Sequence, residues 1–354
     1  MSQSPVPLDV KIGQMLLVGF RGLEVDANHP IVQDIRQRHL GGVVLFDYDV
    51  QTAQFVRNIA SPAQLKTLIA ALQSFAATPL LVTMDQEGGE VTRLRESYGF
   101  PPTLSHQALG QRNDLKVTRE ESGKMAHTLA EMGVNLNLAP VVDLNINPNS
   151  PAIGAHERSF SADPQIVTQQ ALAFIAAHHE QGVLCTLKHF PGHGSATQDT
   201  HKGFVDVTNT WSRPELEPYR AIIAAKQADA IMTAHVFNAT LDPTYPATLS
   251  KATITGILRN ELHYGGVVIT DDMQMGAIRE LYGFEVAIEK TIEAGVDIIA
   301  IANNLIYEED AAARTFALIK QLVTTGGISE ARIDQSYQRI QQLKSKKGFS
   351  YVSP

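Results

Sequence analysis

The sequence predicts an α/β protein that folds as a single (β/α)8 barrel of the TIM type. Short, largely apolar segments recur along the chain, and amphipathic segments with helical spacing separate most of them. The apolar segments cover residues 14–20, 41–46, 80–85, 134–143, 183–190, 230–236, 266–273 and 297–303. Strands that are apolar on both faces indicate a parallel sheet covered by helices. Eight strand–helix units are the number that a TIM barrel requires.

Four amphipathic segments show the helical pattern most clearly, and a fifth follows the last strand. The four cover residues 63–76, 164–182, 213–227 and 284–295. The fifth covers residues 329–348, with Ser329 as its predicted N-cap, and we expect it to close the barrel. A doubly wound open sheet is the rival architecture, but no GxGxxG motif follows an early strand. No repeat or linker divides the chain, so we predict one catalytic barrel domain over residues 1–354.

Composition and charge exclude several classes of partner. The 354 residues include 29 Lys and Arg against 37 Asp and Glu, and the net charge of -8 does not attract nucleic acid or an anionic membrane. No apolar run approaches the roughly 18 residues that cross a bilayer, and the N-terminus lacks a signal-peptide pattern. The single cysteine, Cys185, lies in an apolar segment, which predicts a packing role. We therefore expect a cytoplasmic, monomeric protein that binds neither nucleic acid nor membrane.

Polar side chains follow the predicted strands at the point where each strand ends. They include carboxylates, imidazoles, an ammonium group and guanidinium groups, whereas the strands themselves are apolar. These residues are Asp85, Arg93, Asp143, Arg158, Lys188, His189, His235 and Asp271. Because active sites of TIM barrels lie at the carboxyl ends of the strands, their recurrence predicts an active site at that end.

The most informative segment runs from Leu187 to His201 and reads LKHFPGHGSATQDTH. It leaves the fifth strand through Lys188 and His189, and proline and glycine then interrupt regular structure. A loop of this kind on a rigid scaffold is suited to holding a polar ligand. Because Pro191, Gly192, Gly194, Ser195 and Ala196 offer little side-chain bulk, we expect residues 191–201 to move and to carry His201 in and out of the site.

The residue types in this pattern favour chemistry at a sugar anomeric carbon. Asp271 follows the apolar run VVIT and is therefore expected at a rigid strand tip, where a carboxylate can attack an electrophilic carbon. Asp199 lies two residues before His201, and a carboxylate bonded to one imidazole nitrogen raises the basicity of the other. A nucleophilic carboxylate beside a proton-transfer group fits double displacement. The residues expected to hydrogen-bond the sugar are Asp85, Arg93, Arg158, Lys188 and His189.

Three motifs together resemble bacterial glycoside hydrolase family 3. They are KHFPGHG with the downstream Asp-Thr-His, DQEGG followed by RLR, and ITDDM. The similarity is greatest to the β-N-acetylglucosaminidase branch that acts in peptidoglycan recycling. The resemblance implies that Asp271 is the nucleophile and that His201 is the acid/base, oriented by Asp199. It also implies a retaining enzyme that needs no cofactor or metal and that removes terminal N-acetylglucosamine from muropeptides or related sugars.

Three positions depart from the usual pattern of that family. Glu90 follows Gly88-Gly89, where the family usually has arginine, and three residues rather than one separate Gly154 from Arg158. Thr270 precedes the Asp pair where serine is commoner. Threonine keeps the hydroxyl group of serine, so we expect the change at position 270 to have little effect. We expect Glu90 and the longer segment before Arg158 to affect which substrate is used rather than the type of reaction.

Other functions fit parts of the same pattern. A phosphorylase of the same family would use phosphate in place of water, and a β-glucosidase would act on a different sugar. A metal-dependent barrel hydrolase would use ligands from the set His189, His193, Asp199, His201 and His235, although their spacing matches no known ligand motif. A sugar-binding barrel without catalysis would bind its ligand but not turn it over.

Overall fold

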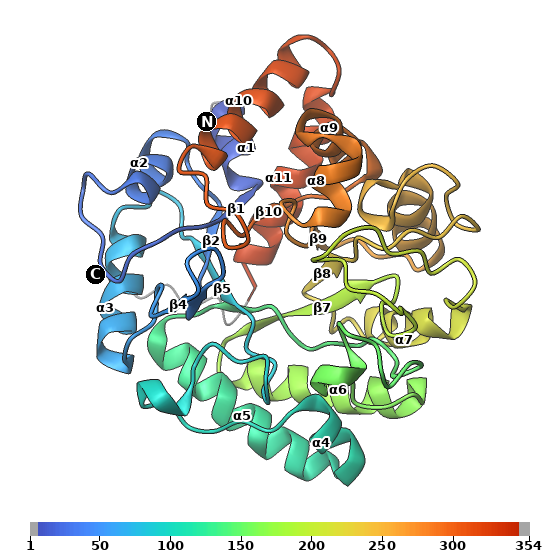
Figure 1. Cartoon of the computed structure of the whole chain (residues 1–354). Coiled ribbons are helices and arrows are strands. Elements are labelled where there is room, and N and C mark those ends of the chain that lie inside the picture. Colours follow the sequence, from blue (N-terminus) through green and yellow to red (C-terminus); the bar gives the residue numbers. More distant parts are fainter. Residues whose placement is uncertain (1–5, 347–354) are drawn as a thin grey trace.

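A computed structural model describes residues 6–346 and contains a parallel eight-stranded barrel surrounded by helices (Figure 1). The strands are β1 (Leu16–Gly19), β2 (Gly42–Val44), β5 (Leu81–Met84), β6 (Leu136–Asn137), β7 (Leu184–Phe190), β8 (Ala230–Thr233), β9 (Val267–Ile269) and β10 (Ile299–Ile301). Their order in the sheet is β10-β1-β2-β5-β6-β7-β8-β9, and a parallel bridge between Ile269 and Ile298 brings the two edges together. Each predicted strand segment contains one of these strands, so the predicted fold class is confirmed.

The apolar composition of the strands has a direct structural reason. All strand residues of the barrel are buried, because one face packs in the interior and the other packs under the helices. Cys185 on β7 is part of this core, which confirms its packing role. Such burial of continuous apolar strands supplies the main favourable free energy of folding.

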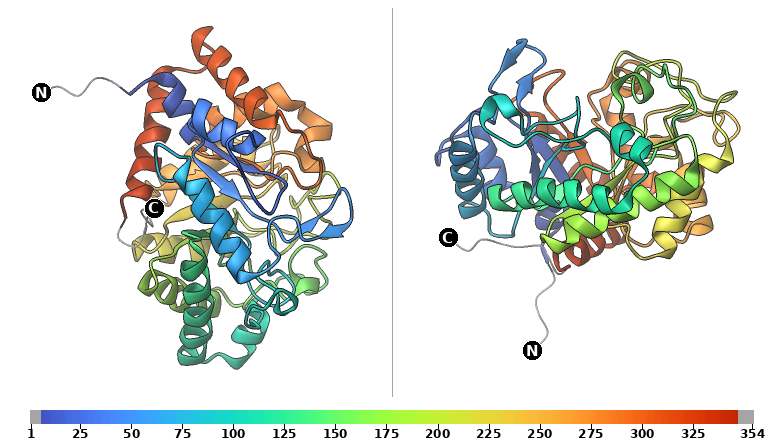
Figure 2. Two further views of the ribbon diagram at one scale, coloured as in Figure 1. Left: turned by 90° about the vertical axis from the view of Figure 1, so that its left-hand side faces the viewer. Right: turned by 90° about the horizontal axis from the view of Figure 1, so that it is seen from below.

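The helices form the outer layer of the barrel, and the views in Figure 2 show them around the strands. They are α1 (Leu8–Gln14), α2 (Pro30–Gln37), α3 (Pro62–Ser74), α4 (His106–Arg112), α5 (Leu115–Met132), α6 (Pro164–Glu180), α7 (Glu217–Ala224), the π-helix η5 (Ala252–Glu261), α8 (Gly276–Tyr282), α9 (Phe284–Ala294), α10 (Ala311–Thr324) and α11 (Glu330–Lys344). The segment predicted at 213–227 is divided into the 3-10 turn η3 (Arg213–Leu216) and α7. None of these helices within residues 6–346 is long and apolar enough to cross a membrane.

The final helix, α11, closes the end of the barrel at which the strands begin. Ser329 caps it as predicted, because its side chain accepts a hydrogen bond from the Arg332 amide at 3.3 Å. Lys344 donates hydrogen bonds to the carbonyl oxygens of Gly41 and Pro79, at 2.8 and 2.7 Å. These two residues lie just before β2 and β5, so Lys344 ties α11 to the amino ends of two strands.

A short hairpin stands at the opposite end of the barrel. It consists of β3 (Tyr48–Asp49) and β4 (Gln54–Phe55) and lies in the connection between β2 and α3. The right-hand view of Figure 2 shows this hairpin rising at one end of the barrel and α11 lying at the other. The sequence analysis did not predict the hairpin, because each strand has only two residues.

The role of Lys344 in closing the barrel predicts its effect on stability. Lys344→Met should lower the free energy of unfolding by about 2–4 kcal/mol, since buried carbonyl oxygens lose their donor. Urea denaturation followed by circular dichroism measures this loss. The matched control is Lys320→Met on α10, which removes a half-exposed ion pair with Asp9 and should cost less than about 1 kcal/mol. Equal effects of the two substitutions would contradict the assigned role of Lys344.

Candidate active site

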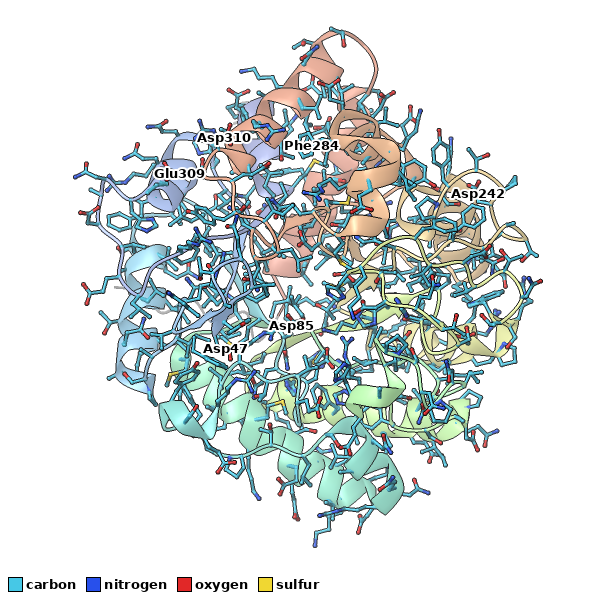
Figure 3. The ribbon with its side chains drawn as sticks, viewed as in Figure 1. Asp47, Asp85, Asp242, Phe284, Glu309 and Asp310 are labelled. Atoms are coloured by element: carbon cyan, nitrogen blue, oxygen red, sulfur yellow. The ribbon has the colours of Figure 1, made fainter. Side chains whose placement is uncertain are left out.

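A cavity of about 450 Å³ opens at the end of the barrel where the strands finish. This volume lies within the range of small-molecule sites in proteins. All eight side chains that were assigned from the sequence to catalysis or sugar binding line the cavity: Asp85, Arg93, Arg158, Lys188, His189, Asp199, His201 and Asp271. Asp143 and His235, which were also expected at this end of the barrel, are buried beside it. In Figure 3, Asp85 lies near the middle of the barrel opening, whereas Asp242, Glu309 and Asp310 lie toward the periphery.

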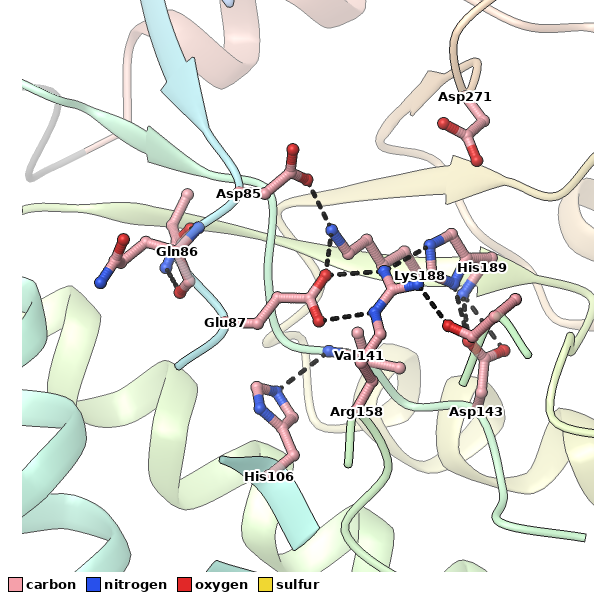
Figure 4. A network of polar contacts seen from close by, with 12 residues as sticks. Asp85, Gln86, Glu87, His106, Val141, Asp143, Arg158, Lys188, His189 and Asp271 are labelled. Atoms are coloured by element: carbon pink, nitrogen blue, oxygen red, sulfur yellow. Dashed lines mark hydrogen bonds and ion pairs between the residues drawn. The ribbon is translucent and has the colours of Figure 1, made fainter. Parts of the chain in front are cut away.

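A buried carboxylate that the sequence analysis did not select, Glu87, organises the floor of the cavity (Figure 4). Its Oε1 and Oε2 accept hydrogen bonds from Arg158 Nη2 and Nε at 2.7 and 2.8 Å. Its Oε1 also lies 2.7 Å from Lys188 Nζ. Burial raises the pKa of Glu87, but the charges of Arg158 and Lys188 outweigh it and hold the pKa below its usual range. Glu87 is therefore ionised and fixes two cationic side chains, Lys188 from the end of β7 and Arg158 from the loop after β6.

Asp85 extends this network toward the cavity. Its two carboxylate oxygens accept hydrogen bonds from Lys188 Nζ at 2.7 Å and from Arg93 Nη2 at 2.9 Å. Burial raises the pKa of Asp85, and the charges of Lys188 and Arg93 lower it more strongly. Asp85 is consequently ionised and faces the cavity as a hydrogen-bond acceptor.

Arg158 reaches the cavity despite the longer segment that precedes it. Residues Gly154–His156 form the 3-10 turn η2, and the extra length is accommodated there. Glu157 has a positive φ of 55°, and its Oε2 accepts a hydrogen bond from Ser105 Oγ at 2.7 Å. The Arg158 guanidinium then donates to the Ala152 carbonyl oxygen at 2.7 Å. Arg158 therefore lines the cavity, and His156 of the longer segment lines it as well.

Asp143 fixes the ring of His189. The Asp143 carboxylate accepts hydrogen bonds from His189 Nδ1 at 2.7 Å and from the His193 amide at 2.8 Å. A carboxylate only accepts, so the proton of His189 lies on Nδ1. The other ring nitrogen lies 3.2 Å from Arg158 Nη2, which only donates. Both nitrogens of His189 are therefore occupied, and the ring is oriented rather than free to transfer a proton.

Lys188 and His189 are consecutive in β7, yet both side chains line the cavity. Side chains in a regular strand point alternately to opposite faces. The register between β7 and β8 is irregular between Leu187 and Phe190. At this irregularity the alternation is interrupted, which allows one strand end to contribute two polar groups to the same site.

Asp199 and His201 form a hydrogen-bonded pair in the loop after β7. The Asp199 Oδ1 lies 2.7 Å from His201 Nδ1 and also accepts a hydrogen bond from the His201 amide at 3.0 Å. Burial lowers the pKa of His201, but the bond to Asp199 and the negative charge of Asp271 raise it overall. The pair leaves His201 Nε2 available, so this imidazole can donate and accept a proton.

The two adjacent aspartates after β9 have different surroundings. Asp272 accepts hydrogen bonds from the amides of Ala302 and Gln274 at 2.9 and 3.2 Å, and burial raises its pKa to about 6. Burial also raises the pKa of Asp271, but the nearby His235, His189 and His201 outweigh it and lower the pKa. Both aspartates line the cavity, but Asp271 is the ionised one with the lowered pKa, whereas the Asp272 carboxylate connects the ends of β9 and β10.

The remaining histidines of the predicted metal set have structural roles. His235 Nε2 lies 3.0 Å from the Asp272 carbonyl oxygen, and His193 Nε2 lies 3.2 Å from Thr200 Oγ1. Burial lowers the pKa of both rings, that of His193 to about 4. Within residues 6–346 no group of three or more His, Cys, Asp or Glu side chains is arranged to hold a metal ion.

The loop that carries His201 is anchored in its first half. Residues 191–196 are buried, whereas His201 and its neighbours at 197, 198 and 202 are exposed. A Cβ at Gly194 would lie 1.7 Å from the Leu144 carbonyl oxygen, so small residues here permit close packing. The expectation that small size leaves 191–196 loosely held is therefore wrong. The loop motion that we predict is therefore restricted to residues 197–201, of which Thr197, Gln198 and His201 are exposed.

The sequence and the structure are similar to those of known sugar-processing proteins. Residues 7–343 match the profile of the glycosyl hydrolase family 3 N-terminal domain. The chain is 32% identical to beta-hexosaminidase A of Pseudoalteromonas piscicida over 380 residues, which cover 98% of this chain and 62% of that protein. It is 39% identical to a beta-hexosaminidase of Xylella fastidiosa over 296 residues, which cover 82% of this chain and 83% of the relative.

A solved structure shows the same architecture. The family 3 beta-N-acetylglucosaminidase from Paenibacillus sp. FPU-7 superimposes with a TM-score of 0.89 at 36% identity, over 99% of this chain and 64% of the solved chain. The present chain thus spans less than two thirds of the length of this protein and of the Pseudoalteromonas relative.

A buried carboxyl group beneath the loop after β7 predicts a pH-dependent stability. Glu215 is 1% exposed, and burial raises its pKa to about 8. Because the folded pKa lies above the unfolded value of about 4.3, the native state loses stability as pH rises between these values. Glu215→Gln should therefore gain stability over the wild type at pH 8 but not at pH 4.

Urea denaturation at both pH values measures the effect of Glu215→Gln. The exposed Glu217→Gln, in the same segment, is the control and should follow the wild type at both pH values. If Glu215→Gln and the control show the same pH dependence, Glu215 is not protonated in the folded protein.

Proposed function

Because the chain belongs to glycosyl hydrolase family 3, we propose that it is a retaining exo-β-N-acetylglucosaminidase. The observation that carries this proposal is the combination, in one cavity, of the ionised Asp271 with the Asp199–His201 pair. A nucleophilic carboxylate and a separate acid/base are the two groups that double displacement requires. The proposed unit of activity is a single catalytic barrel domain.

In the first step, Asp271 attacks the anomeric carbon and the glycosidic bond breaks. His201 protonates the departing oxygen, so that the aglycone leaves as a neutral alcohol. The product is a sugar bound covalently to Asp271. The lowered pKa of Asp271 supports this role, because the attacking group must be ionised.

In the second step, His201 takes a proton from water, which attacks the same carbon and releases the sugar from Asp271. Asp199 keeps the His201 ring oriented and stabilises the imidazolium ion through the 2.7 Å contact. The raised pKa of His201 supports its alternation between acid and base.

The buried network supplies groups that match a sugar ring. Lys188, Arg93 and Arg158 can donate hydrogen bonds to hydroxyl or acetamido oxygens, whereas Asp85 can accept them from hydroxyl groups. His189 can contact the sugar through the edge of its fixed ring. The cavity lies above the buried core of the barrel, and we propose that it takes a terminal residue.

The proposed substrate is a terminal N-acetylglucosaminide, in muropeptides or related sugars of peptidoglycan recycling. The beta-hexosaminidases and the beta-N-acetylglucosaminidase to which the chain is similar support this sugar. The cytoplasmic location and the monomeric state stay predictions from the sequence.

Phosphorolysis is the second candidate reaction, because the proposed acid/base is a histidine. A carboxylate in that position would repel an incoming phosphate more strongly than an imidazole does. Phosphate would then replace water in the second step and give a sugar 1-phosphate. The same two catalytic groups would serve either acceptor.

The first prediction concerns the sugar and the acceptor. The protein should hydrolyse an aryl N-acetyl-β-glucosaminide without added phosphate and should act far more slowly on the matching β-glucoside. Released aryl alcohol and the sugar product are measured with and without phosphate, and Asp271→Asn serves as the inactive control. Turnover of the glucoside alone would contradict the proposed substrate, and a sugar 1-phosphate product would establish phosphorolysis.

The second prediction concerns the proton-transfer pair. His201→Ala should lose roughly 10²–10⁴-fold in rate on substrates whose leaving groups need protonation. It should lose much less in the first step with activated aryl glycosides, because these leaving groups depart without a proton. Steady-state and burst kinetics over a series of aryl N-acetylglucosaminides measure this difference.

Asp199→Asn provides the control for the proton-transfer pair. It keeps the shape of the side chain but weakens the orientation and the basicity of His201, so the loss should be smaller and the pH profile should shift. A His201→Ala enzyme that is equally impaired on every leaving group, with an unchanged pH profile, would make His201 a binding residue.

A further inference from the structure

Two side chains that the proposed reaction does not use stand at the mouth of the cavity. Glu90 and His156 both line it, yet 67% of the Glu90 side chain and 50% of the His156 side chain are exposed. Glu90 Oε2 lies 2.7 Å from His156 Nδ1. Since they are exposed and also line the cavity, they occupy its entrance rather than its floor.

Both side chains are carried by turns that the fold holds in place. Glu90 lies at the tip of a tight turn closed by the bridge between Gly88 and Val91. His156 belongs to η2, which is attached to the start of α4 through Glu157 and Ser105. A Cβ at Gly89 would lie 2.6 Å from the Cβ of the same Ser105. The two turns therefore rest on a common support, and the Glu90–His156 pair has a defined position.

Apart from His156, the cationic side chains that line the cavity all have acidic partners of their own and do not neutralise Glu90. The pair has a net charge of zero when His156 is protonated and of -1 when it is not. The Arg93, Arg158 and Lys188 side chains that line the cavity are already bonded to Asp85 and Glu87. The imidazoles of His189 and His201 also line the cavity, and they are bonded to Asp143 and Asp199.

We propose that Glu90 and His156 form a leaving-group subsite that favours uncharged aglycones and disfavours aglycones that carry a carboxylate. The inference rests on the proposed function, in which the terminal sugar lies beside Asp271 and the aglycone extends toward the mouth. A neutral sugar there offers hydroxyl and amide donors to the Glu90 carboxylate. A carboxylate there meets Glu90 with no unengaged cation to receive it, so repulsion reduces its binding.

The proposal narrows the substrate class of the same site. Among the substrates that the proposed function includes, it places N-acetylglucosamine linked to a second N-acetylglucosamine above the muropeptide type, in which N-acetylglucosamine is linked to an N-acetylmuramic acid. The two disaccharides share the terminal sugar and the β-linkage, and the second carries a lactyl carboxylate on its aglycone. Their comparison therefore isolates the charge at the leaving-group subsite.

The test compares kcat/KM for these two disaccharides in the wild type, Glu90→Gln and Glu90→Lys. The wild type should prefer the neutral disaccharide. Glu90→Gln should shift the ratio toward the carboxylate-bearing disaccharide by roughly three- to tenfold, the size expected for one like-charge contact in a solvated site. Glu90→Lys should shift it further, and high salt should reduce both shifts.

Glu96→Gln is the matched control, because Glu96 is an exposed acid in the same loop and does not line the cavity. Its ratio should equal that of the wild type. An unchanged ratio in both Glu90 variants, or equal shifts in the Glu96 variant, would overturn the proposed subsite. An aryl N-acetylglucosaminide is assayed in parallel: no turnover by the wild type would contradict the proposed function, whereas turnover with an unchanged ratio contradicts only the subsite.

Discussion

The site depends on one buried ionic contact, that of Glu87 with Lys188 and Arg158. These residues come from the ends of β5 and β7 and from the loop after β6, so the contact joins three neighbouring units of the barrel. Glu87 would be an unpaired buried charge without the two cations, and breaking a buried pair costs about 3–5 kcal/mol. Once Glu87 holds the two cations, Asp85 and His189 have fixed partners as well. The positions of the side chains at the cavity floor therefore follow from the pairing of these buried charges.

The same contacts distinguish the carboxylates that are held by neighbouring side chains from the one that is available for reaction. The carboxylates of Asp85, Glu87 and Asp143 all accept hydrogen bonds or ion pairs from fixed neighbours. Asp271, in contrast, receives its hydrogen bond only from the adjacent Asp272 amide at 2.8 Å among the described residues. The pKa of Asp271 is lowered and that of His201 is raised, and groups whose surroundings shift their pKa values apart mark the division of nucleophile and acid/base in enzyme sites. The proposed nucleophile is the carboxylate that the network leaves available.

The sequence was sufficient to predict the barrel and the side chains that line its cavity. Buried parallel strands leave a continuous apolar signal, and polar residues at their carboxyl ends meet by the geometry of the barrel. Glu87 was not selected, and Asp143 was placed at a strand end but given no role, because the sequence does not reveal which acids turn toward buried cations or imidazoles. The burial of residues 191–196 was missed for a similar reason. Small residues are typical of mobile loops and also of tight packing, and only the position of Leu144 distinguishes the two.

Mass spectrometry of a trapped intermediate tests most directly that Asp271 is the free, ionised nucleophile of this network. The protein is treated with an activated, fluorinated N-acetylglucosaminide, which forms the covalent intermediate quickly and is hydrolysed from it slowly. The protein is then digested, and the labelled peptide is sequenced by tandem mass spectrometry. The account predicts one attached sugar, located on Asp271 and absent from the adjacent Asp272. A sugar attached to Asp272 or Asp85, or inactivation without any attached sugar, would contradict it.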